Sequence, residues 1–122
     1  SHVVSFVAFE VLKKKLDYPD LFTLLRISDE DREIDGHEFK MTVKRVIDEL
    51  YTLNNKGKIK LSPVLTSKEL EEIIDLGINN VCIYHTNLPV MRTKDGNITS
   101  EDLKLLYYYH NRLLGYGLEK CI

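Results

Sequence analysis

The chain has 122 residues, enough for one domain and too few for two ordinary ones. Hydrophobic residues make up 43% and charged residues 30%, a globular balance that excludes an intrinsically disordered chain. A formal net charge of -2 gives no overall attraction to nucleic acid or anionic lipid, and two cysteines provide no disulfide framework, so we expect a cytoplasmic protein.

The first segment, Val3 to Lys15, is predicted to be a helix buried on most sides, because the run up to Leu12 is almost wholly apolar. That run is only about half of the roughly twenty residues that a membrane span needs. It starts close to the first residue, so we expect a domain excised from a larger protein. Pro19 suits the first turn of a second, short helix. The apolar residues of this helix are Leu21, Phe22, Leu24 and Leu25.

An acidic connector, residues 28–36, precedes the clearest amphipathic helix of the chain. Asp35 is placed to cap this helix, with Glu38 completing a capping box. Apolar residues then recur at helical spacing, which indicates one buried face. They are Phe39, Val43, Val46, Ile47, Leu50 and Leu53. Asn54, Asn55 and Gly57 are predicted to end the helix.

The segment that follows is predicted to contain a short strand and a further helix. Lys58 to Leu61 alternates polar and apolar residues, which favours a strand that Pro63 interrupts. Thr66 and Glu69 form a second capping box, and Gly77 is expected to stop the helix. The apolar face of this helix comprises Leu70, Ile73, Ile74 and Leu76.

Two strands, Val81 to Thr86 and Val90 to Thr93, are predicted to form a hairpin around residues 87–89, and Asp95-Gly96 is a strong turn. With a last helix after that turn, the element order predicts one α+β domain over residues 1–122. We expect it to be mostly α, a helical domain with a small β-hairpin. A winged-helix-like shape is one form that this element order could take, and the likeness carries no function.

Thr99 and Asp102 resemble a third capping box, opening a last helix that runs to about Leu114 before Gly115 and Gly117 break it. One face of this helix carries Leu103, Leu106, Tyr107, His110 and Leu114. A second face carries Leu105, Tyr109, Arg112 and Tyr116. A helix that is apolar on two faces must bury both, so one meets the core and the other needs a partner. An ordinary central helix with polar tips is the alternative.

Candidate metal sites are incomplete. The acidic connector has EF-hand-like spacing, but Thr42 stands where that loop needs a bidentate glutamate. The spaced residues are Asp31, Glu33, Asp35 and Gly36. On a strand, Cys82 and His85 would point to opposite faces, which argues against a shared metal with His110 or Cys121. No nucleophile elbow, phosphate loop or dinucleotide fingerprint occurs, so we expect no metal and no cofactor.

A nucleic-acid site is also not expected. The helix from Glu38 to Asn54 carries the cations Lys40, Lys44 and Arg45, but the acids Glu38, Asp48 and Glu49 lie among them. Mixed signs are poor for phosphate contacts. A free-standing, winged-helix-like interaction module that binds protein or DNA nevertheless stays open as the alternative function.

Several segments, in order, resemble the C-terminal region of glycerol-3-phosphate acyltransferases, the bacterial phospholipid-synthesis family. They are the opening Ser1-His2-Val3-Val4, the run Ile74-Asp75-Leu76-Gly77, the segment Cys82 to Thr86, and the segment Tyr107 to Leu113. The last is similar to a family segment with two aromatics followed by an asparagine. Where the family continues with histidine and an aromatic, this chain has Gly115-Tyr116.

The resemblance implies a parent enzyme that transfers a fatty acyl group from coenzyme A or acyl carrier protein to the 1-hydroxyl of glycerol 3-phosphate, at the cytoplasmic membrane face. That family relies on an H-x-x-x-x-D motif. None of the residues five positions after a histidine is aspartate: they are Val7, Thr42, Val90 and Gly115. We therefore expect a C-terminal accessory domain with no catalytic residues, packed on an upstream catalytic domain. The interface candidates are Tyr107, Tyr109, Asn111 and Arg112.

Overall fold

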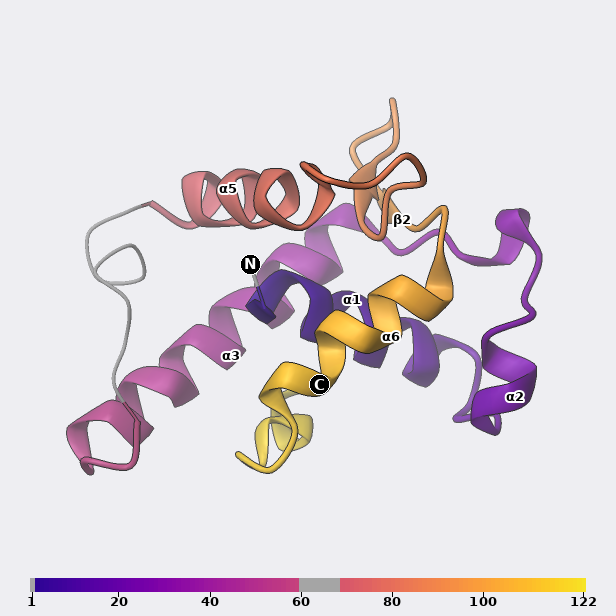
Figure 1. Cartoon of the computed structure of the whole chain (residues 1–122). Coiled ribbons are helices and arrows are strands. Elements are labelled where there is room, and N and C mark those ends of the chain that lie inside the picture. Colours follow the sequence, from indigo (N-terminus) through magenta and orange to yellow (C-terminus); the bar gives the residue numbers. More distant parts are fainter. Residues whose placement is uncertain (1, 60–68) are drawn as a thin grey trace.

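The computed structural model describes residues 2–59 and 69–122, and it is mostly helical with a small antiparallel sheet (Figure 1). The longer helices are α1 (His2–Lys15), α3 (Gly36–Asn55), α5 (Leu70–Cys82) and α6 (Leu103–His110). The short elements are α2 (Leu21–Leu24), the 3-10 turns η1 (Asp29–Asp31), η2 (Asn111–Leu113) and η3 (Leu118–Cys121), and strands β1 (Met91–Arg92) and β2 (Ile98–Thr99). This confirms the predicted α+β class, mostly α.

Helix α1 is the centre of the domain. It packs on α6, α3 and α5, and every residue from Val3 to Leu12 is buried. The prediction of a helix buried on most sides is confirmed. The helix ends where Asp17 and Tyr18 take left-handed conformations, with φ values of 61° and 54°, and the Tyr18 N–H donates to the Lys13 carbonyl at 2.8 Å. In the part of the chain described, no helix is both long enough and apolar enough to cross a membrane.

Helix α3 follows the predicted amphipathic stripe. The Asp35 carboxylate accepts from the Glu38 N–H at 2.9 Å, as a helix cap does. Gly57, at a φ of 74°, follows the end of the helix. The predicted strand from Lys58 is wrong for Lys58 and Ile59, which are not in a strand. The rest of that strand, with Pro63, lies outside the described residues, and so does Thr66. Glu69 itself is the N-cap residue of the next helix, so the predicted capping box with Glu69 inside that helix is wrong.

Helix α5 is longer than predicted. Gly77 does not stop it, and the helix continues through Val81 to Cys82. The predicted strand from Val81 to Thr86 is therefore wrong, and so is the hairpin around residues 87–89. The physical reason is the helical period: Ile74, Gly77 and Val81 are all buried, so they share the face that meets α1 and α3.

The hairpin forms instead around the predicted turn at Asp95-Gly96. Met91 pairs with Thr99 and Arg92 with Ile98, and Gly96 has a φ of 84°. Ile98 also bridges to Ile34 in the connector before α3. The Asn97 side chain then accepts from the Gly36 N–H at 2.9 Å, so the hairpin is fastened to the first residue of α3.

Helix α6 begins later and ends earlier than predicted. Asp102 is itself the cap, accepting from the Leu105 N–H at 3.0 Å, while Thr99 lies in β2, so the predicted capping box is wrong. The helix stops at His110 and continues as the η2 turn. Gly115 and Gly117 follow with left-handed φ values of 93° and 71°, which confirms the predicted break.

Candidate functional site

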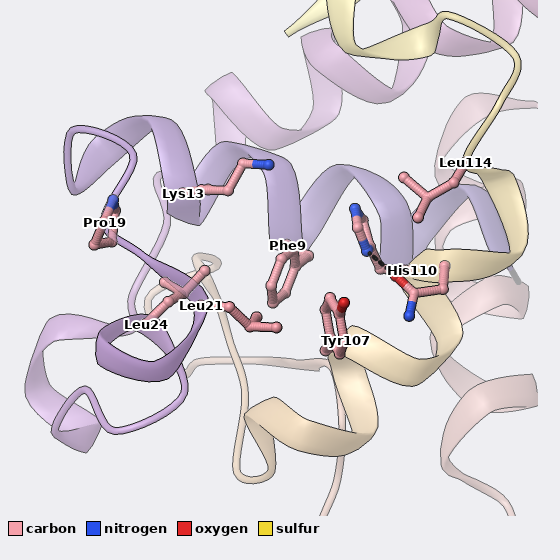
Figure 2. A pocket seen from close by; sticks show the side chains of 9 residues that line it. Phe9, Lys13, Pro19, Leu21, Leu24, Tyr107, His110 and Leu114 are labelled. Atoms are coloured by element: carbon pink, nitrogen blue, oxygen red, sulfur yellow. Dashed lines mark hydrogen bonds between the residues drawn. The ribbon is translucent and has the colours of Figure 1, made fainter.

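An open pocket of about 310 Å³ lies between α1, α2 and α6. One side is formed by Phe9, Lys13, Pro19, Leu21 and Leu24, and the other by Tyr107, His110, Asn111 and Leu114. Figure 2 shows the Phe9 and Tyr107 rings and the Leu21 side chain facing the same space. Most of the wall is therefore apolar or aromatic, and the nitrogen-bearing side chains are those of Lys13, His110 and Asn111.

A buried polar cluster stands behind this pocket. Glu10 and His110 are only 4% and 3% exposed. His110 Nε2 lies 2.9 Å from Glu10 Oε2, and Lys13 Nζ lies 3.0 Å from the same oxygen. His110 Nδ1 is 3.0 Å from the Asn111 side-chain oxygen, and the ring stacks on Phe6 with centroids 5.3 Å apart. Both polar ends of the imidazole are thus occupied.

The carboxylate of Glu10 is held ionised by its partners. Burial raises the pKa of Glu10, but hydrogen bonds from His110 and Lys13 outweigh it and leave the pKa below the ordinary 4.5. At neutral pH the Nε2 of His110 therefore carries the hydrogen that Glu10 accepts. A buried carboxylate of this kind links the two ends of the chain, because α1 supplies Glu10 and α6 supplies His110.

We expect the free energy of unfolding to fall in acid partly through Glu10. The folded-state pKa is depressed, so its stabilisation is present above pH 4.5 and is lost as the pH falls through the lower folded-state value. Urea unfolding across this range should show a shallower decline for Glu10→Gln than for the wild type. Glu30→Gln, at an exposed position, is the control and should keep the wild-type slope. A wild-type slope in Glu10→Gln would contradict this assignment.

His110 is poorly placed to act as a general base. Such a base needs a ring nitrogen within hydrogen-bond reach of the substrate proton. Here Nε2 is engaged by Glu10 and Nδ1 by Asn111. The pair therefore serves to join α1 and α6, and the pocket beside it can bind a molecule more readily than transform one.

Cys82, His85 and His110, which were weighed as metal ligands, have other partners. Cys82 is the last residue of α5, where its thiol donates to the Val90 carbonyl at 3.0 Å, and His85 lies in the turn that follows. Burial raises the pKa of the Cys82 and Cys121 thiols, so neither is an activated nucleophile. Among residues 2–59 and 69–122, no group of three or more His, Cys, Asp or Glu side chains could hold a metal ion.

The acidic connector is used for local structure. Asp35 caps α3, and the Asp31 carboxylate accepts from the Ser28 hydroxyl at 3.1 Å. The Thr42 hydroxyl donates to the Glu38 carbonyl at 2.8 Å, inside α3. These contacts account for the spacing that resembled a calcium loop.

The four interface candidates are divided between two places. Tyr107 and Asn111 line the pocket. Tyr109 is half-buried, and its hydroxyl lies 2.7 Å from His85 Nε2 in the turn after α5. Arg112 is exposed, with its guanidinium 5.6 Å from the Tyr108 ring and a hydrogen bond of 3.2 Å to the Tyr108 hydroxyl. Thus the second face of α6 is covered at Tyr109 and open at Arg112.

Three exposed side chains, which we call the tyrosine patch, lie within two residues of His85 or Tyr109 in the sequence. It consists of Ile83, Tyr84 and Tyr108, which are 70%, 90% and 55% exposed. Tyr108 contacts the Tyr109 ring with centroids 5.5 Å apart, and Tyr109 in turn contacts His85, the neighbour of Tyr84. The patch therefore joins the turn after α5 to the outer side of α6.

The charges on α3 and α5 bear on the DNA-binding alternative. Lys40 and Lys44 pair with Glu71 and Asp48, and Arg45 donates to the Cys121 carbonyl at 2.8 Å. These contacts occupy the three cations of α3, the helix weighed for phosphate contacts. The neighbouring helix α5 adds Glu71, Glu72 and Asp75 and has no lysine or arginine. A helix of this charge repels the phosphate backbone.

Sequence reasoning missed Glu10. The signal was present, because Glu10 is the single charged residue within the apolar run Val3 to Leu12, and a buried charge requires a partner. The partner, His110, could not be read from the pattern.

Comparisons of the chain with models of known protein families, with curated proteins and with solved structures find no match.

Proposed function

We propose that this chain is a non-catalytic accessory domain of a glycerol-3-phosphate acyltransferase, and that the tyrosine patch docks on the catalytic domain of that enzyme. The parent enzyme would transfer a fatty acyl group to glycerol 3-phosphate at the cytoplasmic membrane face. One observation carries the proposal. Two segments that resemble the family, Cys82 to Thr86 and Tyr107 to Leu113, lie apart in sequence and meet through the Tyr109–His85 contact.

The chemistry of the patch suits a protein interface. Tyrosine offers a large apolar ring with a polar tip, and such side chains are enriched at interface centres. Tyr84 and Tyr108 stand out from the surface, whereas Tyr109 anchors the patch through His85. Arg112 lies beside Tyr108 and adds a cation at the edge. This combination of aromatics and an arginine is typical of the residues that dominate binding energy.

The histidines of the chain favour docking over catalysis. No histidine of the chain is followed by aspartate at the family spacing. The buried histidine, His110, has both ring nitrogens engaged by Glu10 and Asn111. The proposal therefore assigns acyl transfer to the parent's catalytic domain and a positioning role to this one.

The proposal is tested by titrating the chain against a separately expressed acyltransferase domain that carries the H-x-x-x-x-D motif. We expect saturable binding that weakens at least about tenfold in the Tyr84→Ala, Tyr108→Ala double variant, a loss of about 1.4 kcal/mol. Calorimetry provides the measurement. Phe22→Ala is the matched control, because Phe22 is an exposed aromatic on α2 outside the patch.

Three results would reject the proposal. Acyl transfer to glycerol 3-phosphate by the chain alone would contradict the non-catalytic assignment. Equal weakening by Phe22→Ala and by the double variant would remove the patch from the interface. Tight, salt-sensitive DNA binding without affinity for the acyltransferase domain would instead support the free-standing module.

A further inference from the structure

We infer that the pocket between α1, α2 and α6 binds one medium-chain fatty acid, with the tail against Phe9 and Leu24 and the carboxylate at Lys13 and Asn111. The proposal does not rest on the docking function. The pocket and the tyrosine patch use different residues, so each can fail without the other.

The walls of the pocket fit an alkyl tail. Phe9 and Leu24 are buried and form its apolar base, while Leu21 and Leu114 are 40% and 46% exposed at its edge. The volume of about 310 Å³ is at the lower end of the roughly 300–1,000 Å³ of small-molecule sites, so a medium chain fits better than a long one. Burying this tail would also cover the exposed Leu21, which gains hydrophobic free energy.

The polar groups fit a singly charged head. The contact with Glu10 uses one N–H of the Lys13 ammonium, which leaves its other N–H groups free to donate to a ligand. Its side chain is 31% exposed, so it can reach a carboxylate at the mouth of the pocket. Asn111 offers an amide on the opposite side. The Glu10 carboxylate behind them repels a second negative charge, so a carboxylate suits this site better than a phosphate dianion.

The direct test is a titration of the whole chain with decanoate below its critical micelle concentration, followed by amide chemical shifts. We expect one saturable site, with shifts centred on Phe9, Leu24, Tyr107 and Asn111. Decanol, which has the same tail and no charge, should bind at least about tenfold more weakly, since it loses the charge-assisted contact. Hexanoate should bind more weakly than decanoate because its tail covers less of the pocket wall.

Two variant pairs locate the head group. Lys13→Met should weaken decanoate at least about tenfold, whereas Lys104→Met, at an exposed lysine of α6, should leave it unchanged. Because Lys13 also contacts Glu10, a second pair avoids that cluster. Leu114→Asp places a negative charge at the edge of the pocket and should weaken decanoate more than Leu114→Asn does. Decanol binding should not distinguish these two Leu114 variants.

Several outcomes would overturn the inference. Absence of saturable decanoate binding would reject the site. Equal affinity for decanoate and decanol, or equal affinity of the two Leu114 variants for decanoate, would reject the carboxylate at this mouth. Shifts centred on Tyr84 and Tyr108 would place the ligand on the tyrosine patch instead. None of these results bears on the docking experiment, which measures binding to an acyltransferase domain without any lipid.

Discussion

Replacing His110 with leucine should lower the free energy of unfolding by about 3–5 kcal/mol, because the change leaves the Glu10 carboxylate buried without its main partner. Lys13 also contacts Glu10, but its side chain is 31% exposed and offers weaker compensation. The leucine also cannot reproduce the stacking of the imidazole on Phe6 or its tilted contact with Phe9. Urea unfolding followed by circular dichroism at neutral pH provides the measurement.

The control for this prediction removes both members of the Glu10–His110 pair. The double variant Glu10→Leu, His110→Leu should be more stable than His110→Leu alone, since two apolar side chains leave no buried charge unpaired. Lys13 can then turn toward water. If the two single changes simply add in the double variant, Glu10 and His110 are not coupled and the cluster does not stabilise the α1–α6 contact as described.

Gly36→Ala should destabilise the domain by about 1–3 kcal/mol through crowding, although alanine has a higher helix propensity than glycine. A Cβ atom at Gly36 would collide with the backbone carbonyl of Gly96, so either the hairpin or the start of α3 must move. That movement would lengthen the hydrogen bond from the Gly36 N–H to Asn97, and it would strain the Ile34–Ile98 bridge beside it. Thermal and urea unfolding provide the measurement.

His37→Ala is the matched control for Gly36. His37 is the next residue of the same helix turn and is exposed, so its replacement should change the unfolding free energy little. Amide hydrogen exchange would show in addition whether Gly36→Ala loosens the hairpin first, with Ile98 losing protection before the core of α1. A Gly36→Ala variant as stable as the wild type would show that the hairpin does not pack closely on α3.

The helices were predictable where one residue pattern decides burial. A helix is the arrangement that buries the apolar side chains of the run Val3 to Leu12 and of the stripe on α3. Both segments are helices, as expected. The region after Gly77 has no such constraint, since Val81 to Thr86 suits a strand by composition. There the packing of Ile74 and Val81 against the core prevails, which a local pattern does not contain.

The candidate site was predictable only in part. The aromatic content of the last helix pointed to Tyr107 and Tyr109, but their separation between the pocket and the tyrosine patch depends on where α2 and the turn after α5 lie. The Glu10–His110 contact joins residues 100 positions apart. Contacts between residues so far apart in the sequence depend on tertiary packing, so helix and strand propensities and residue spacing do not predict them.

The packing of α1 on α6 also constrains how this domain can be made. The first helix packs most extensively on α6, late in the sequence, so the core depends on contacts of high sequence separation. During synthesis on the ribosome, the apolar face of α1 that packs on α6 stays uncovered until α6 has emerged. The nascent chain is therefore expected to need chaperone protection, and to acquire resistance to proteases only once α6 has emerged.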